Sequence, residues 1–375
     1  MYSGSFCRCT VLHAMKKKNT DISLQDTAPF SRPLLEWYAE FRRDLPWRNT
    51  ADPYRIWISE IILQQTRVVQ VLDYYLRFVG RFPDIRSLAL AEEDEVMKYW
   101  QGLGYYSRAR NLHAAAKCML ADYGGEFPRS YDGVRALKGI GDYTAAAIVS
   151  FAYGMPYAVV DGNVYRVLSR LFDIDTPIDT GAGKKLFAEL AERLLDRNQP
   201  GLYNQALMEL GALQCVPRSP RCELCPLSDK CLAYASGRVE QLPVKQGKTA
   251  VRPRYFHYFH IVCGGDTWIR RREGNDIWRN LYEFPLIETD EPMEWADLSE
   301  SGAFGELFGR TSPVCFSGEP YRCKHVLSHR IIHAAFYRVE IEIPSPVLLA
   351  EYRRVSESEL GDYAVARLTE IYLER

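Results

Sequence analysis

The chain has 375 residues, of which 47% are hydrophobic and 25% charged, and its formal net charge is −1. This length allows two or three domains, and this composition is that of an ordinary globular protein. No run approaches the ~20 apolar residues that a membrane span needs. The ten cysteines come without a secretory signal. We therefore exclude a membrane protein and a secreted scaffold held together by disulfides.

The N-terminal segment is basic and contains no acidic residue before Thr20. It includes Arg8 and the lysines at 16–18. Two interpretations stay open: a short transit peptide, or a true start at Met15. We predict that residues 1–30 form an extension without ordered structure.

Apolar residues three and four apart recur from Leu34 to Ala235, and the periodic runs end near Gly or Pro. The predicted helices are Leu34–Phe41, Trp57–Phe78, Glu93–Gln101, Arg108–Tyr123, Tyr143–Tyr153, Val164–Leu171, Lys185–Arg197 and Leu202–Leu213. Short polar breaks between them indicate an all-α domain of packed helices, at residues 31–240.

The composition changes after this helical region. Residues 241–254 are polar and contain two prolines, which is typical of a linker. Strand-like runs follow at Tyr255–Val262, Thr267–Arg271, Pro313–Phe316 and Ile331–Ile343, with helical stretches at Glu294–Leu307 and Ser356–Ala364. We predict a smaller α+β domain with an antiparallel sheet at residues 255–375.

Four cysteines lie close together with the spacing C-x6-C-x2-C-x5-C, at Cys215, Cys222, Cys225 and Cys231. They cannot all form disulfides without strain, but they can surround one metal centre. Zinc sites usually have two CxxC pairs, whereas four thiolates followed by Pro226 favour a [4Fe–4S] cluster. A zinc site and a metal-free loop remain as alternatives.

A glycine-rich turn, Leu137-Lys138-Gly139-Ile140-Gly141, lies between two predicted helices. Glycines two apart allow a sharp turn and leave amide N–H groups at the start of the next helix, which suits a phosphate. This is the layout of a helix-hairpin-helix, which holds a nucleic-acid backbone. A simple tight turn is the alternative, although the basic cysteine loop downstream favours a phosphate-binding function.

Two carboxylates stand out. Glu60 has mostly apolar helical neighbours, so it is either on the wet side of its helix or a functional acid with a raised pKa. Asp161 interrupts an apolar run and is placed to cap the helix that follows. One desolvated acid and one oriented carboxylate can cleave a glycosidic bond, and a phosphate-binding turn nearby indicates a nucleoside in DNA.

Several motifs together resemble the MutY family of adenine DNA glycosylases. They are the cysteine loop, Leu45-Pro-Trp-Arg48, Ser59-Glu-Ile-Ile-Leu-Gln-Gln-Thr66, Gly102-Leu-Gly-Tyr-Tyr-Ser-Arg-Ala-Arg-Asn111 and Asp161-Gly-Asn-Val164. The resemblance covers residues 34 to 235. It implies a helix-hairpin-helix glycosylase that removes adenine mispaired with 8-oxoguanine, or with guanine, from double-stranded DNA. Such an enzyme flips its target base out of the duplex.

The resemblance also assigns roles to residues. Glu60 matches the acid that protonates adenine, Asp161 the carboxylate that faces the ribosyl cation, and Tyr143 and Asn163 their supporting residues. Gln65 and Tyr105 match residues that wedge into the base stack. Leu45, Trp47 and Arg48 match neighbours of the adenine pocket, and Lys138, Gly139 and Gly141 belong to the turn that contacts the DNA backbone.

The sister family, endonuclease III, has the same turn and cluster but carries a nucleophilic lysine two residues after the second glycine. Tyr143 occupies that position here, and no lysine lies between Gly141 and Lys184. A Schiff base and strand cleavage are therefore not expected. This residue favours a monofunctional glycosylase.

The C-terminal part resembles the family's Nudix-like recognition domain, through Asn275-Asp-Ile-Trp-Arg-Asn-Leu-Tyr-Glu-Phe-Pro285 and His325-Val-Leu-Ser-His329. Family members often have Phe where Leu327 stands, while Ser328 and His329 match residues that contact 8-oxoguanine. A plain turn before a strand is the alternative. The acidic helix signature of Nudix pyrophosphatases is absent after Glu283, so nucleotide hydrolysis is not expected.

Two other functions stay open at this point: a glycosylase of the endonuclease III type for thymine or oxidised pyrimidines, and a non-catalytic iron–sulfur protein that binds DNA. We expect a monomer without membrane association. A bacterial chain would act at the nucleoid in the cytoplasm, and a eukaryotic one in the nucleus or the mitochondrion.

Overall fold

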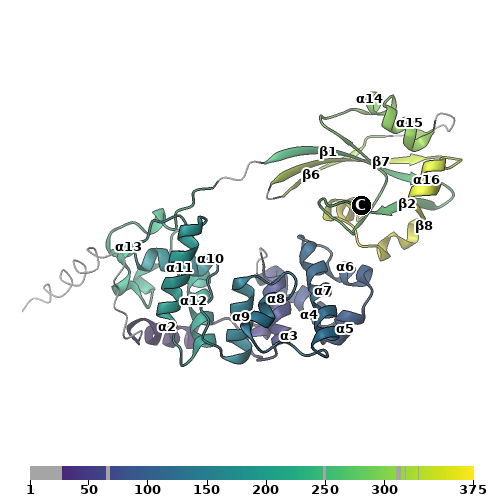
Figure 1. Ribbon diagram of the computed structural model, residues 1–375. Helices are drawn as coiled ribbons and strands as arrows, with labels where there is room; N and C mark the ends of the chain where they lie inside the picture. The colour runs from purple at the N-terminus through teal and green to yellow at the C-terminus, as the bar shows by residue number, and fades with distance from the viewer. Residues whose placement is uncertain (1–27, 65–67, 248–250, 310–313, 317, 328) are drawn as a thin grey trace, which may run out of the picture. The chain divides into compact units, whose positions relative to one another are not determined.

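The computed structural model describes all residues except 1–27, 65–67, 248–250, 310–313, 317 and 328 (Figure 1). The predicted N-terminal extension therefore lies almost entirely outside the described residues. The chain forms two compact units, Met1–Gln64 with Glu126–Gly247, and Gln65–Gly125 with Lys248–Arg375. In the described part, no helix is both long and apolar enough to span a membrane.

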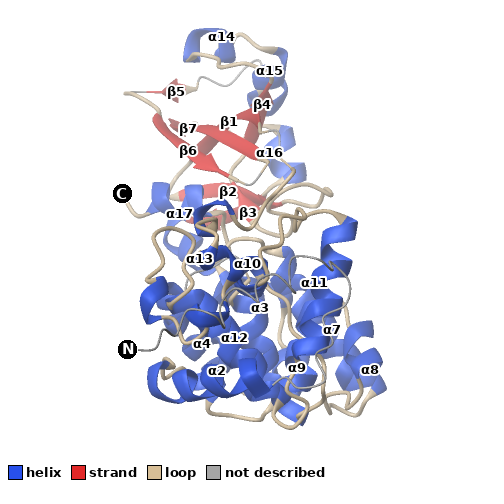
Figure 2. Cartoon of the chain, turned by 90° about the vertical axis from the view of Figure 1, so that its left-hand side faces the viewer, coloured by secondary structure: helices blue, strands red, loops and turns tan. Residues whose placement is uncertain are grey.

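The described part of the first unit is helical (Figures 1 and 2). Its α-helices are α2 (Ala28–Phe41), α3 (Pro53–Ile62), α8 (Tyr131–Ala136), α9 (Asp142–Tyr153), α10 (Gly162–Leu171), α11 (Gly181–Leu194), α12 (Pro200–Leu213) and α13 (Leu232–Ala235). Buried side chains of α2, α10, α11 and α12 share one core, which includes Leu34, Leu168, Phe187 and Leu207. Val164, Val167, Leu168 and Leu171 follow the 3, 4, 7 spacing of one helix face, so α10 turns that face inward.

The predicted helix Trp57–Phe78 is two helices in the structure. α3 ends at Ile62 and α4 (Val68–Arg81) begins after a break. Apolar residues continue on both sides of the break, so the periodicity does not mark it. The short helices α5 (Ile85–Leu90) and α8 were not predicted, because one or two turns are too short to display a helical period.

Helices α4 and α5 belong to the second unit, with α6 (Glu93–Trp100) and α7 (Ser107–Asp122). Aromatic side chains pack between α4 and α6: Phe78 meets Trp100 edge-on at 5.8 Å between ring centroids. Phe82, which follows α4, packs edge-on against Tyr99 at 5.4 Å. These contacts fix the acidic N-terminal turn of α6 relative to the other helices of this unit.

The C-terminal part of the second unit contains two sheets. Strands β1 (Arg252–Val262), β4 (Leu286–Thr289), β5 (Cys315–Phe316), β6 (Tyr321–Val326) and β7 (Arg330–Glu340) form one, and β2 (Asp266–Arg271), β3 (Tyr282–Glu283) and β8 (Arg353–Ser356) the other. Helices α14 (Trp295–Ser299), α15 (Gly302–Phe308), α16 (Pro346–Glu351) and α17 (Arg367–Leu373) accompany them. Phe259, Trp268, Phe304 and Tyr337 form part of the core.

The prediction of an antiparallel sheet is wrong for the longest strand pair. β1 and β7 pair in parallel along their whole length, from Arg252 with Arg330 to Val262 with Glu340. The other pairs in both sheets are antiparallel. A parallel pair requires a long crossover, and the elements between β1 and β7 supply it. Strand propensity alone does not reveal pairing direction. The predicted helix Ser356–Ala364 is instead a 3₁₀ segment, Glu357–Asp362.

Within the second unit, the first turn of α6 binds the β2–β3 region. Glu93 lies 2.8 Å from the Arg271 guanidinium and also accepts from the Asn280 side chain. The Tyr282 hydroxyl donates to Asp94 at 2.9 Å. The helix dipole stabilises acidic residues at a helix N-terminus. These two carboxylates are therefore stabilised both by the dipole of α6 and by their partners in the β2–β3 region. We call the set of Glu93, Asp94, Arg271, Asn280 and Tyr282 the α6 latch.

Candidate active site

Glu60 is buried in the first unit. It lies on α3 among apolar neighbours and is 6% exposed. Its Oε2 accepts a 2.7 Å hydrogen bond from the Tyr143 hydroxyl. Burial raises the pKa of the Glu60 carboxyl to about 7, although the Tyr143 hydrogen bond opposes the rise. A carboxyl with this pKa is partly protonated at neutral pH and can donate a proton.

Asp161 caps α10. Its Oδ1 accepts from the Val164 N–H at 2.7 Å, and its Oδ2 accepts from the Asn163 side chain at 2.8 Å. Burial outweighs these two donors, so the pKa of Asp161 lies above its usual value although both donors lower it. Donors and a helix N-terminus both favour the charged form, so the cap provides a fixed carboxylate.

Tyr143 connects the two acids electrostatically. Burial holds the pKa of its hydroxyl well above the usual range, and the charges of Glu60 and then Asp161 raise it further. The structure thus brings Glu60, Asp161, Tyr143 and Asn163 into one site, although they come from α3, the α10 cap and α9.

Arg166 holds Asn163 in position and also contacts the start of the cysteine loop. The Arg166 guanidinium donates to Asn163 Oδ1 at 2.8 Å, to the Gly211 carbonyl at 2.6 Å and to the Cys215 carbonyl at 2.7 Å. A Cβ atom on Gly211 would lie 2.6 Å from the Asn163 Cβ, so only glycine fits there.

The glycine-rich turn joins α8 to α9. Gly139 has a φ of 82°, and Gly141 is the N-cap of α9 without any side-chain cap. Lys138, Gly139 and Gly141 are all exposed. The first amides of α9 are therefore available to an anion such as a DNA phosphate.

The predicted adenine-pocket neighbours lie together on a short 3₁₀ turn. Leu45 and Trp47 are buried, and Arg48 forms a 2.6 Å ion pair with Glu209 of α12. Burial has the largest effect on the pKa of Glu60, and the Arg48 charge has a smaller effect, which lowers that pKa. The Arg48 guanidinium is therefore within electrostatic reach of the acid. Sequence analysis missed Glu209. Its only local signal is a lone acid within the apolar run of α12.

The four cysteines lie around one small cavity with Arg170. All four are free thiols, and Arg170 Nη1 lies 3.4 Å from the Cys215 sulfur. Among the described residues, no three His, Cys, Asp or Glu side chains converge on a single ion position. Four thiols around one cavity are the donor set that a [4Fe–4S] cluster requires.

A second pocket, of about 180 Å³, lies within the second unit. Tyr105, Arg110, Trp278, Leu327 and His329 are among its lining residues. Tyr105 has a φ of 45° and is 48% exposed, so its side chain is accessible to solvent and is not part of the core. The other two residues predicted to contact DNA bases, at positions 65 and 328, lie outside the described residues.

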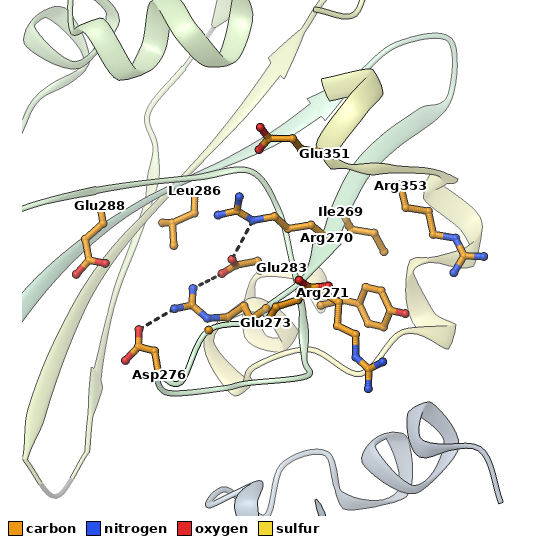
Figure 3. Close-up of a pocket in the computed structure, with 13 residues that line it drawn as sticks. Ile269, Arg270, Arg271, Glu273, Asp276, Glu283, Leu286, Glu288, Glu351 and Arg353 are labelled. Carbon is orange, nitrogen blue, oxygen red and sulfur yellow. Dashed lines mark hydrogen bonds and ion pairs between the residues drawn. The ribbon is translucent and has the colours of Figure 1, made fainter. Parts of the chain in front are cut away.

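A wider cavity, of about 720 Å³, lies in the C-terminal part of the second unit (Figure 3). Two of its arginines form ion pairs: Arg272 with Glu283 at 2.5 Å and Asp276 at 2.9 Å, and Arg270 with Glu283 at 3.4 Å. These ion pairs offset part of the positive charge in the cavity.

Comparisons with known proteins cover both parts of the chain. Residues 58–193 match the HhH-GPD superfamily of base excision DNA repair proteins. Residues 215–231 match the iron–sulfur binding domain of endonuclease III, and residues 257–375 match the NUDIX domain.

An adenine DNA glycosylase of Buchnera aphidicola subsp. Baizongia pistaciae is 37% identical over 72% of this chain and 77% of its own length. The chain belongs to the adenine DNA glycosylase family. The human adenine DNA glycosylase is 42% identical over 58% of this chain and 41% of its own length. A solved thermostable thymine-DNA glycosylase has a TM-score of 0.52 and 32% identity, over 58% of this chain and 100% of that one.

For this member of the adenine DNA glycosylase family, several predictions are confirmed. The fold is a helix-hairpin-helix glycosylase domain with a cluster loop, followed by a Nudix-type domain. The enzyme class is that of a DNA glycosylase of base excision repair, and the cofactor is a [4Fe–4S] cluster. Cys215, Cys222, Cys225 and Cys231 would hold the cluster, which would cross-link the loop after α12 to α13.

Proposed function

We propose that this glycosylase hydrolyses the N-glycosidic bond of adenine mispaired with 8-oxoguanine, or with guanine, in double-stranded DNA. One observation supports the proposal above all: Glu60, whose pKa burial raises to about 7, lies in the same site as the capped Asp161 carboxylate. The adenine DNA glycosylases that the chain resembles carry the substrate in their name.

In the proposed mechanism, the protonated Glu60 carboxyl transfers its proton to N7 of the flipped adenine. The C1′–N9 bond then breaks, and the electron pair leaves with the base. The ionised Asp161 faces the resulting oxocarbenium-like sugar, and a water molecule then adds its oxygen to C1′ and gives up a proton to the Glu60 carboxylate. Tyr143 and Asn163 orient the two carboxyls through their hydrogen bonds. General acid assistance of this kind contributes roughly 10²–10⁴-fold.

Strand cleavage is not part of the proposal. The side chain two residues after Gly141 is the Tyr143 hydroxyl, which donates to Glu60 and has a pKa well above its usual range. It cannot replace an amine in forming a Schiff base. We propose a monofunctional enzyme that acts as a monomer on duplex DNA.

Selection of the base opposite adenine is assigned to the pocket of the second unit. Tyr105 would stack beside the lesion, with Arg110, Leu327 and His329 around the 8-oxoguanine. Leu327 supplies an apolar contact where relatives often have an aromatic ring, so stacking on that side is replaced by aliphatic packing. The DNA backbone would be held by the exposed turn at Lys138, Gly139 and Gly141.

The test uses duplexes with adenine opposite 8-oxoguanine, adenine opposite guanine, and thymine opposite guanine. Released base and strand nicking are measured separately under single-turnover conditions. We expect free adenine from the first two duplexes, no nicking without alkali, and at least 100-fold slower release for Glu60→Gln with duplex binding retained. Glu36→Gln, an exposed acid on α2, is the matched control. Release of thymine but not adenine, or full activity of Glu60→Gln, would overturn the proposal.

A further inference from the structure

Two arginines of the second unit lie together at the pocket of about 180 Å³. Arg110 of α7 lines this pocket, and its Nη1 donates to the Arg279 carbonyl at 2.7 Å. Arg279 lies in the β2–β3 loop, directly after Trp278, which lines the same pocket. Within the described part of the chain, neither guanidinium forms an ion pair with a carboxylate. We call Arg110 and Arg279 the rim pair.

The loop that carries Arg279 has a fixed conformation. Its neighbours Trp278 and Asn280 have φ values of 59° and 67°, in a region that residues other than glycine seldom adopt. Such conformations persist only where the surrounding structure enforces them. Trp278 is buried, and Asn280 donates its backbone N–H to the Arg272 carbonyl at 2.8 Å and its side chain to Glu93. The backbone is therefore held in place, while the Arg279 side chain is exposed to solvent.

The acidic residues around the rim pair have other partners. Glu93 pairs with Arg271 at 2.8 Å in the α6 latch. Asp276, which also lines the pocket, accepts from Arg254 at 2.8 and 2.7 Å and from Arg272 at 2.9 Å. These ion pairs leave the two charges of the rim pair without a close negative partner in the described structure.

The two members of the rim pair repel each other unless an anion lies between them. Burial lowers the pKa of Arg110, the charge of Arg279 lowers it further, and Glu93 opposes both with a smaller effect. A guanidinium nevertheless keeps its proton at physiological pH, so the repulsion persists. Guanidinium groups present planar sets of N–H donors that match the oxygens of a phosphate. A phosphate at this rim would therefore both remove the repulsion and accept hydrogen bonds.

We propose that the rim pair binds a backbone phosphate of the DNA strand that carries 8-oxoguanine. This inference rests on the proposed function, because it takes the pocket beside Arg110 as the site of 8-oxoguanine. A base in that pocket remains covalently attached to its strand, so the phosphates that flank its sugar lie near the rim. Phosphate contacts position a duplex but carry no sequence information. The rim pair thus holds the 8-oxoguanine strand while adenine is flipped out of the other strand.

A series of duplexes with one neutral linkage tests the proposal. Each contains 2′-fluoro-2′-deoxyadenosine opposite 8-oxoguanine, because the electron-withdrawing fluorine destabilises the oxocarbenium-like sugar and so prevents cleavage during the measurement. A methylphosphonate, which lacks the phosphate charge, replaces in turn each linkage next to 8-oxoguanine and the linkage beyond it on either side. Fluorescence anisotropy at several salt concentrations compares the full-length wild-type chain with Arg279→Gln.

With the duplex that contains only phosphates, Arg279→Gln should weaken binding roughly five- to twentyfold, as expected for a charged hydrogen bond near the surface. The slope of log affinity against log salt should become shallower by about one, because one phosphate is no longer neutralised. One neutral linkage should weaken wild-type binding by a similar factor. The same linkage should weaken Arg279→Gln binding by less than about twofold, because both changes remove the same contact.

Two further variants serve as controls. Arg279→Lys keeps the charge and should recover part of the affinity. Arg86→Gln removes the charge of an exposed arginine on α5 of the same unit, and it should leave the effect of every neutral linkage unchanged. Arg279→Gln should also leave the preference for 8-oxoguanine over guanine unchanged, because a phosphate contact does not read the base.

The inference would be overturned if no neutral linkage lost its effect in Arg279→Gln. It would also be overturned if Arg279→Gln changed the preference between the two bases but not the salt slope, because Arg279 would then read the base. Adenine release by the wild-type chain from the unmodified duplex is measured in parallel. A wild-type chain that releases no adenine overturns the proposed function itself, whereas an active chain without a linkage that depends on Arg279 overturns only the role of the rim pair.

Discussion

The protonation state of Glu60 connects a single side chain to the pH dependence of the whole reaction. Burial raises its pKa to about 7. The acid form transfers the proton, so the single-turnover rate should fall as pH rises through about 7, approaching tenfold per unit at higher pH. Rates of adenine release measured from about pH 5.5 to 9 check this. A flat profile above pH 7 would contradict the role of Glu60 as the acid.

Glu60 should also lower the free energy of unfolding at alkaline pH. A carboxyl whose folded pKa lies above its unfolded value contributes stability that is fully present below about pH 4.5 and is lost as pH rises through about 7. The wild-type chain therefore carries a buried charge at pH 8. Glu60→Gln should raise the free energy of unfolding at pH 8, relative to its effect at pH 5, by on the order of 1–3 kcal/mol.

Thermal unfolding of both proteins at the two pH values measures this difference. A variant that is destabilised equally at pH 5 and pH 8 would contradict it. The matched substitution Glu36→Gln, on an exposed surface, should show no such pH dependence.

At the element scale, the α6 latch joins the first turn of one helix to strands of the Nudix-type domain. We expect Glu93→Gln with Asp94→Asn to loosen the pocket that contains Tyr105 and His329. The preference for adenine opposite 8-oxoguanine over adenine opposite guanine should then fall by roughly three- to tenfold, corresponding to about 1 kcal/mol from half-exposed pairs.

The ratio of release rates on the two duplexes measures that preference. Glu92→Gln is the control, because Glu92 precedes the same helix and makes no side-chain cap there. An unchanged ratio in the double variant would show that the latch does not support recognition.

The elements themselves were predictable to different degrees. α10 was predicted because its apolar spacing and its Asp161 cap are both local features. The break between α3 and α4 was not, because the apolar pattern continues across it. Likewise, the strand character of β1 and β7 was evident, but their parallel pairing depends on a crossover that no local pattern specifies.

At the scale of the whole molecule, the cluster should act as a cross-link rather than a reagent. Its four proposed ligands follow α12, and three of them, Cys215, Cys225 and Cys231, pack against the same core as α10 and α12. Cys225→Ala should lower iron content and the free energy of unfolding, on the order of 3 kcal/mol, comparable with losing a covalent cross-link. Iron analysis and thermal unfolding measure this. A folded, iron-free variant that binds duplex DNA with wild-type affinity would contradict the structural role.

The spacing of residues within short segments was sufficient to identify the motifs that carry the chemistry. The four cysteines, the glycine-rich turn and the capping Asp161 lie within short segments, where covalent connectivity already holds the groups near one another. The sequence alone therefore determined the family, and it predicted the cofactor and the candidate acids.

Only the tertiary structure decided how these groups act on each other. Glu60 and Tyr143 are 83 residues apart, and Glu209 is 161 residues from Arg48. The raised pKa of Glu60 requires burial by distant segments, and the orientation of Arg48 requires a carboxylate from another helix. Burial and ion pairing across such separations arise from packing, which a one-dimensional pattern does not encode.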